Sequence, residues 1–339
     1  MGNRPSESSN NGHQKEENAI EINGRDDISS VAFLTDERHI VGGGSEHMIR
    51  RWQVEDGKEV GTPMDAGSPI CNIAVSRSGR WVVSGTRSGL VTVWNAKSDE
   101  KVSEFRGHSD WVRVLDVTSD GTRIATGSYD ETVCVWSIST GQRLLGPLKH
   151  DSMVAAVKFS PDRRFIATAT CWRDSLRIYD SQNGHLSVEF PIRVNSPFNQ
   201  SLAWASDSKQ LFALSLHGNI HCLDVSTGAT RSQWLIHSSN EPRCIALAGN
   251  GTIIAASANS SVSFWDTTTH KQVGSVIEHT ADVVSMAISE NYEIVIAASK
   301  KITLRNIYDV LPSSYHEIVS VLVSEINRVR RSLNYKLFC

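Results

Sequence analysis

The stretch from Gly107 to Trp136 contains the residue types of a nucleophilic hydrolase: His108, Ser128 and Asp130. In such enzymes a histidine takes the proton of an attacking serine, and a carboxylate orients the histidine. The serine must also be exposed beside an oxyanion pocket, and in many hydrolases it lies in a G-x-S-x-G turn. The sequence contains no such turn. These residue types therefore leave two interpretations, a catalytic site or a structural one.

Other residue types that carry chemistry show no spacing suited to a ligand. The six cysteines are scattered singly, without a C-x-x-C pair, and the twelve histidines are equally dispersed. We therefore expect no metal site. The run VGGGS at 41–45 starts neither a G-x-G-x-x-G motif nor a P-loop, so we expect no nucleotide cofactor and interpret the glycines as close packing.

The elements around these residues recur along the chain. An apolar alternation ends at positions 52, 94, 136, 179, 223, 265 and 305, so the intervals are 42, 42, 43, 44, 42 and 40 residues. A second apolar pattern lies upstream of each, in the same phase. Turns such as TSDGT (118–122) and ISTGQ (138–142) separate the segments and supply the positive φ of tight hairpins. The pattern predicts seven units of short strands.

The third unit resembles a WD40 repeat. Gly107-His108, the run GSYDETVCVW (127–136) and its terminal Trp are features of that family, and the family's Trp-Asp pair survives at Trp265-Asp266. The resemblance covers about residues 18 to 306 and implies an all-β fold, a seven-bladed β-propeller at 18–308. Residues 18–22 align with an outer strand that has no blade of its own. We expect them to pair with the last blade (283–306).

The resemblance also implies a structural role for the possible catalytic residues. In WD40 repeats a His, a Ser, an Asp and a Trp form a buried chain of hydrogen bonds, matched here by His108, Ser128, Asp130 and Trp136. Such a brace gives each buried polar group a partner. The other units keep only fragments of the set, among them His150. We therefore expect blade 3 to be the best braced, and we expect no catalytic residues and no enzymatic activity.

The faces of the ring are then the functional surfaces. In WD40 proteins one face is formed by the loops before the first strand and between the second and third strands. The candidate partner-binding residues on these loops are Arg87, Trp111, Tyr129, Met153, Trp172 and Phe198. Trp, Tyr and Arg dominate interface hot spots, and exposed apolar patches usually mark contacts. We predict a scaffold for protein–protein interaction with protein or peptide partners.

Two alternatives use the channel mouth instead. A hydrolytic or ligand-binding propeller would need clustered acids or metal-spaced histidines in the channel-facing strands, and the sequence offers neither. Recognition of a basic or modified peptide could use Glu46, Glu241 and Asp282.

The two ends of the chain differ in character. Residues 1–17 are polar and lack aromatic side chains, which predicts a disordered tail, and Gly2 with Ser6 satisfies a short acylation pattern. Residues 309–339 are predicted to contain a short amphipathic α-helix. Its apolar stripe consists of Tyr315, Val319, Leu322, Ile326, Val329 and Leu333. We expect this stripe to dock on the propeller, and dimerisation through the helix is the alternative.

Composition limits the remaining function classes. The 339 residues carry a formal net charge of −3, so no global basic field favours nucleic acid or an anionic membrane. No early apolar run suggests a signal peptide, and none approaches the roughly 18 residues of a spanning helix. Together with the scattered cysteines, this predicts a cytoplasmic or nuclear protein without stable membrane insertion.

Overall fold

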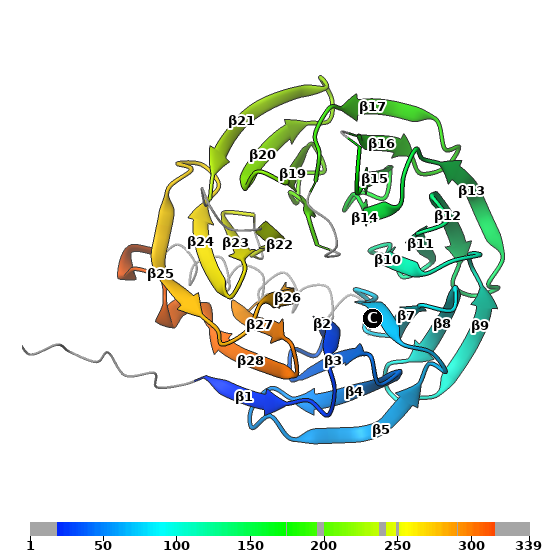
Figure 1. Cartoon of the computed structure of the whole chain (residues 1–339), viewed down its shortest axis with the longest axis horizontal. Coiled ribbons are helices and arrows are strands. Elements are labelled where there is room, and N and C mark those ends of the chain that lie inside the picture. Colours follow the sequence, from blue (N-terminus) through cyan, green and yellow to red (C-terminus); the bar gives the residue numbers. More distant parts are fainter. Residues whose placement is uncertain are drawn as a thin grey trace, which may run out of the picture.

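Each sequence repeat folds into a four-stranded antiparallel sheet, and the described part of the chain forms seven such sheets in a ring (Figure 1). This computed structural model describes residues 19–173, 175–194, 200–236, 242–248, 251–289 and 291–315. Short turns allow consecutive strands to pair, and alternating side chains give each sheet two faces that can be covered. The predicted seven-bladed β-propeller is confirmed.

Six of the blades use four consecutive strands, from the channel outward. Blades 1 to 3 consist of β2 (Ile28–Phe33), β3 (His39–Gly44), β4 (Met48–Gln53) and β5 (Glu59–Asp65); β6 (Ile70–Val75), β7 (Trp81–Thr86), β8 (Leu90–Asn95) and β9 (Lys101–Arg106); and β10 (Val112–Val117), β11 (Arg123–Ser128), β12 (Thr132–Ser137) and β13 (Arg143–Lys149). Blades 4 to 6 consist of β14 (Val154–Phe159), β15 (Phe165–Thr170), β16 (Leu176–Asp180) and β17 (Leu186–Phe190); β18 (Leu202–Trp204), β19 (Gln210–Leu214), β20 (Asn219–Asp224) and β21 (Ala229–Leu235); and β22 (Pro242–Leu247), β23 (Ile253–Ala258), β24 (Ser261–Asp266) and β25 (Gln272–Glu278).

Blade 7 joins the two ends of the ring. It consists of β26 (Val283–Ile288), β27 (Glu293–Ala298), β28 (Lys301–Asn306) and, as its outer strand, β1 (Ile20–Asn23). Ile20 pairs with Leu304 and Asn23 with Lys301, in antiparallel register. Ile22 is buried in the apolar cluster between blades 7 and 1. The predicted pairing of the N-terminal segment with the last blade is therefore confirmed.

The core lies between neighbouring blades. One cluster joins Val91 and Val93 of blade 2 to Leu115, Ile124 and Trp136 of blade 3, all of them buried. Because each sheet covers the next one, an open ring would leave a blade face and a strand edge uncovered.

The inner strands are also linked by hydrogen bonds between a side chain of one blade and the backbone of the next. In each case a side-chain oxygen accepts a backbone N–H. The pairs are Ser30 with Ile73 (3.0 Å), Asn72 with Leu115 (3.0 Å), Asp116 with Phe159 (2.8 Å) and Ser285 with Val31 (3.1 Å). The last of these bonds connects blade 7 to blade 1. The polar inner positions thus hold the blades in a fixed order around the channel.

After β28 the chain turns back along blade 6. A 3₁₀ helix, η1 (Ile307–Asp309), is followed by a helical turn at 313–315. The Val310 carbonyl accepts a hydrogen bond from Ser275 N–H at 3.0 Å, and Tyr315 Oη donates to Asp266 Oδ2 at 3.0 Å. Tyr315, the first residue of the predicted apolar stripe, thus contacts blade 6. The rest of that stripe and the tail at 1–17 lie outside the described residues.

Candidate partner-binding face

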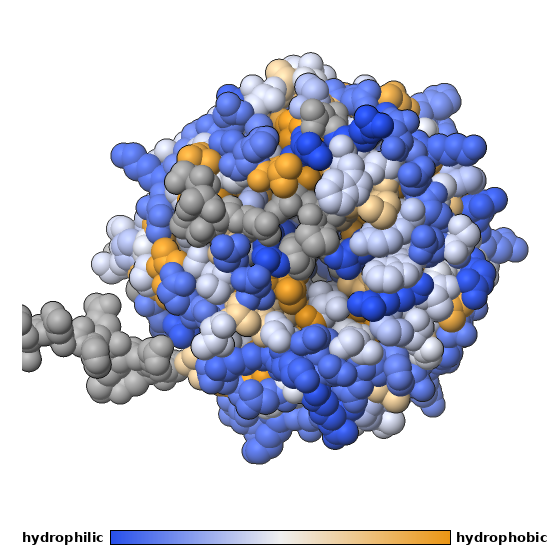
Figure 2. Space-filling model, in the orientation of Figure 1, coloured by the Kyte–Doolittle hydropathy of each residue, from blue (hydrophilic) through white to orange (hydrophobic). Residues whose placement is uncertain are grey.

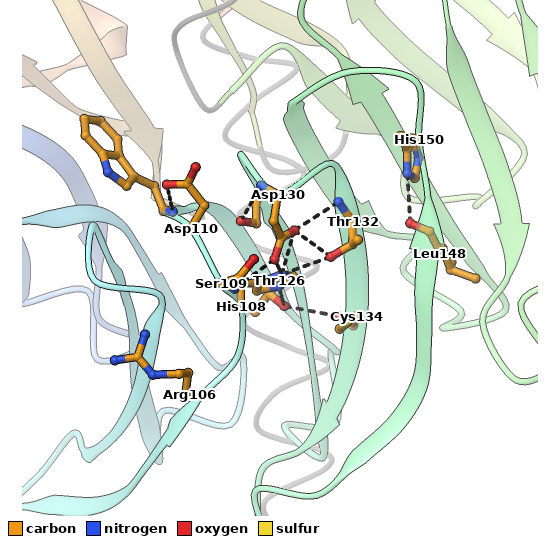
Figure 3. Close-up of polar contacts among 12 residues, drawn as sticks. Arg106, His108, Ser109, Asp110, Thr126, Asp130, Thr132, Cys134, Leu148 and His150 are labelled. Carbon is orange, nitrogen blue, oxygen red and sulfur yellow. Dashed lines mark hydrogen bonds and ion pairs between the residues drawn. The ribbon is translucent and has the colours of Figure 1, made fainter.

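His108 lies at the centre of a buried polar network in blade 3 (Figure 3). Its Nδ1 is 2.9 Å from Asp130 Oδ2, and its Nε2 is 2.7 Å from Thr126 Oγ1. Trp136 Nε1–H donates to the same Thr126 hydroxyl at 2.8 Å. Burial by itself raises the pKa of Asp130, but hydrogen bonds from His108 and Thr132 outweigh it and hold the pKa well below its usual range. The network therefore connects Asp130, His108, Thr126 and Trp136.

The prediction that Ser128 supplies the hydroxyl group of this brace is corrected by the structure. The Ser128 hydroxyl accepts the Asp130 N–H at 3.0 Å, and it is Thr126 that joins the histidine to the tryptophan. Both residues lie on β11, two positions apart, so their side chains point to the same side of the strand. Ser128 and Thr126 are each 0% exposed, so neither offers the accessible hydroxyl that a serine-type nucleophile needs.

Only some of the blades have a hydroxyl-bearing residue at the position equivalent to Thr126. By strand register the other blades carry Gly42, Ser84, Thr168, Ala213, Ala256 and Ile296 there. Ser84 accepts from Trp94 Nε1–H at 3.0 Å, and Thr168 lies 2.9 Å from His150 Nε2. Among these positions a hydroxyl is therefore available in blades 2, 3 and 4.

Blade 1 replaces this network with an ion-pair group. Arg50, whose side chain is 8% exposed, pairs with Glu46 and, through Nη1, with Glu59 Oε1 at 2.6 Å. The glycine run beside it serves close packing, as expected, because a Cβ on Gly43 would lie 2.7 Å from Ile70 Cδ1. Glu46 is thus committed to Arg50 and leaves little charge for a basic peptide at the channel mouth.

The loops before the first strand and between the second and third strands meet on one side of the ring, which we call the loop face. Backbone hydrogen bonds join them in successive blades: Arg87 N–H to Pro69 O at 2.9 Å, and Tyr129 N–H to Trp111 O at 3.1 Å. These bonds place the predicted residues of the two loop sets side by side.

Three of the predicted residues form a stack on the loop face. The rings of Trp111 and Tyr129 are parallel to within 10°, with centroids 5.2 Å apart. The Arg87 guanidinium lies 4.5 Å from the Trp111 ring centroid. Burial raises the pKa of the Tyr129 hydroxyl. Arg87, Trp111 and Tyr129, which we call the aromatic–arginine stack, therefore join blades 2 and 3 into one surface feature.

The remaining predicted face residues behave differently from one another. Met153 is half-buried and packs against the core between blades 4 and 5. Trp172 is 63% exposed, but Cys171 takes the place equivalent to Tyr129, because its N–H bonds to Met153 O at 3.0 Å. Phe198 lies outside the described residues. The structure thus brings together Arg87, Trp111 and Tyr129 and leaves Trp172 as a separate exposed aromatic residue.

Strongly hydrophobic side chains form only small, separate patches on the side of the ring seen in Figure 2, where the described surface is mainly hydrophilic. A partner on such a surface finds no broad apolar area. Amphipathic side chains such as Trp, Tyr and Arg, which offer both apolar area and a polar group, are then the residue types best suited to anchor it.

A cavity of about 400 Å³ opens at the channel mouth. It is lined by Asp27, Ile28, Ser29, Arg113, Arg243, Asp282, Val284 and Ser299. Its carboxylates have partners: Asp282 Oδ2 lies 2.6 Å from Arg243 Nη2, and Asp27 accepts from the Ser299 hydroxyl at 3.0 Å. With Glu241 outside the described residues, the hypothesis of a basic-peptide site gains no support from the acids that can be placed.

Within the described ranges, no group of three or more His, Cys, Asp or Glu side chains is placed to hold a metal ion. The five described cysteines are buried, and none takes part in a disulfide there. No helix in this part of the chain is long and apolar enough to cross a bilayer.

Three segments of the chain match the family described as WD domain, G-beta repeat (WD40): residues 57–95, 99–137 and 142–180. The chain contains WD40 repeats. The matched segments of this WD40 propeller end in blades 2, 3 and 4, the blades with a hydroxyl at the Thr126 position. A search among curated proteins finds no match. WD40 propellers are typically non-enzymatic scaffolds for protein interactions.

Proposed function

We propose that this WD40 propeller is a non-enzymatic scaffold whose protein partner binds the loop face at the aromatic–arginine stack. The observation that carries the proposal is the stack itself. Arg87, Trp111 and Tyr129 come from loops of two blades and pack against one another at a position where the fold needs only turn residues. Location in the cytoplasm or nucleus, expected from the sequence, is part of this proposal.

The stack suits partner binding for an energetic reason. Ordering long side chains at an interface costs roughly 0.5–1.5 kcal/mol for each residue that is immobilised on binding. In this protein the stacking holds Arg87 and Trp111 in place before any partner arrives. Trp172, at 63% exposed, adds a second aromatic contact on the neighbouring blade. A partner can therefore bury large amphipathic side chains at a low cost in entropy.

The proposal predicts that removing the rings abolishes partner capture without unfolding the propeller. In Trp111→Ala with Tyr129→Ala, the proteins that the tagged wild-type chain retains from a cell extract should be lost, while the melting temperature stays within a few degrees. Quantitative mass spectrometry of the captured proteins measures the effect.

A matched control lies at the opposite end of β7. Arg80 stacks over Trp81 at 4.4 Å, the same type of contact as that of Arg87 with Trp111. Arg80→Gln with Trp81→Ala should leave capture intact. If the loop-face variant captures as much as the wild type, or the control loses as much, the proposed function is wrong.

A further inference from the structure

A second arginine lies next to the aromatic–arginine stack, at the channel mouth. Arg113 is the second residue of β10, where the register shifts between Val112 and Val114. Such a bulge takes a residue out of the ladder and redirects its side chain, and Arg113 lines the channel-mouth cavity. Its Nε is buried without a hydrogen-bond partner in the described structure.

Arg113 and Arg87 share a neighbour, Cys71 of β6. Both guanidinium groups lie close enough to the Cys71 thiol to lower its pKa. Burial raises the pKa of that thiol, and the two arginines only partly offset this, so the thiol is neutral and provides no negative charge. Two positive groups from neighbouring blades are therefore held close together.

The described carboxylates do not neutralise this pair. Asp282 is bound to Arg243, and Asp27 accepts from Ser299. Asp110, which precedes Trp111 in the chain, accepts the backbone N–H of Trp111 at 2.7 Å. Among the described residues, no ion pair involves Arg87 or Arg113.

We propose that Arg87 and Arg113 form an anion-binding site that takes a carboxylate from an acidic segment of the partner protein. This inference rests on the proposed function and names the chemistry of the partner. Guanidinium groups match a carboxylate in a two-pronged geometry, and such charge-assisted bonds are about twice as strong as neutral ones. The flat Trp111 and Tyr129 rings beside the site accept an apolar side chain next to the acid.

The charge distribution favours an acidic segment over a basic one. A basic side chain at this point would face two guanidinium groups, and Asp282, one of the two carboxylates of the cavity, is already paired with Arg243. The excess positive charge is local, since the whole chain carries a net charge of −3. A single carboxylate group placed between two side chains fits this arrangement better than a long polyanion, which needs an extended basic surface.

The test uses the full chain and a fluorescein-labelled peptide of four glutamates around one leucine, with a matched peptide of four glutamines. Fluorescence anisotropy at low salt should show binding of the glutamate peptide alone. Arg87→Gln and Arg113→Gln should each weaken it about tenfold or more, the loss expected for a hydrogen bond to a charged group. Arg80→Gln should not change it.

Charge reversal provides a gain-of-function arm. The protein with Arg87→Glu and Arg113→Glu should bind a matched lysine peptide that the wild type ignores. Arg87 is exposed, so Arg87→Gln remains informative if a change at Arg113 impairs folding, which thermal melting reports. A single-stranded oligodeoxythymidine of similar charge is added as a competitor of the glutamate peptide, to test whether the site binds nucleic acid equally well.

The proposal is overturned if the wild type does not bind the glutamate peptide, if both glutamine variants bind it equally well, or if the oligonucleotide competes on equal terms. Failure here is distinguishable from failure of the proposed function. In one outcome, cellular partners are lost from the variant with Trp111→Ala and Tyr129→Ala but are retained by the variant with Arg87→Gln and Arg113→Gln. That outcome would support the loop face as the binding surface and refute the anion site.

Discussion

At the scale of single residues, the His, Ser and Asp that suggest a hydrolase are used inside a blade. The Thr126 hydroxyl serves two neighbours, since it accepts from Trp136 Nε1–H and bonds to His108 Nε2. Both neighbours are buried, so each would be left without a partner if the hydroxyl were lost. The network is therefore a stabilising element with a defined weak point.

Thr126→Val should lower the free energy of unfolding by about 2–4 kcal/mol, because the substitution keeps the shape but leaves two buried polar groups unsatisfied. Ser128→Ala removes one acceptor for the Asp130 N–H and should cost about 1 kcal/mol or less. Urea unfolding followed by tryptophan fluorescence measures both. Equal losses in the two variants would contradict the assignment of Thr126.

Two histidines with lowered pKa values, one buried and one half-buried, should make stability depend on pH. Burial lowers the pKa of His150 and of His279 from 6.5 to about 4. The unfolded chain therefore binds protons in the range from about pH 6.5 down to 4 that the folded chain does not. The contribution of these histidines to the free energy of unfolding is fully present above about pH 6.5 and is lost as the pH falls. Each histidine lowers the free energy of unfolding by up to about 1.4 kcal/mol per pH unit in this range.

His150→Gln should reduce the slope of the unfolding free energy against pH, by the amount that corresponds to about one proton taken up on unfolding. Denaturant unfolding at several values between about pH 5 and pH 7 gives the slope for both proteins. Identical slopes would show that His150 is not buried in its neutral form.

Residue-level detail could be predicted only in part from the sequence. The stacking of Trp111 on Tyr129 follows from loops that the repeat brings together, so both could be named in advance. Thr126 was missed because Thr126 and Ser128 lie on the same side of β11. Only the distance to Trp136 in the structure shows which of the two hydroxyl groups completes the brace. Arg113 was missed because a bulge redirects it, and a bulge breaks the alternation on which strand prediction depends.

At the scale of elements, the repeat interval and the turn residues are local signals, so strand positions were predictable. Loop insertions were not, and the extra residue in blade 4 gave Cys171 the place predicted for Trp172. The most consequential element is β1, which crosses from one end of the chain to complete blade 7. It supplies the only outer strand that blade 7 has in the described structure.

Deleting residues 1–24 should abolish the single cooperative unfolding transition, because β28 loses its partner and Ile22 leaves the core. Deletion of residues 1–18, which retains β1, is the matched control and should melt like the full chain. Differential scanning calorimetry makes the comparison. If both truncated proteins melt alike, β1 does not hold the ring closed.

At the scale of the whole molecule, the closed ring is a rigid platform that fixes the distance between loops of different blades. The aromatic–arginine stack and the arginine pair exist only because blades 2 and 3 lie side by side. The sequence indicated the ring and the residue types of its face. It could not indicate which carboxylates would be neutralised, since ion pairs such as that of Arg243 with Asp282 join segments far apart in the chain.

Site-specific photo-crosslinking tests most directly whether the loop face binds the partner. A benzoylphenylalanine at position 172 of the full chain reports contacts on the loop face, and one at Leu144, 54% exposed on the outer strand β13, reports contacts at the rim. We expect protein adducts from position 172 that disappear when Trp111→Ala and Tyr129→Ala are added, and none from position 144. Adducts from position 144 alone, or adducts at position 172 that persist without the two rings, would contradict this expectation.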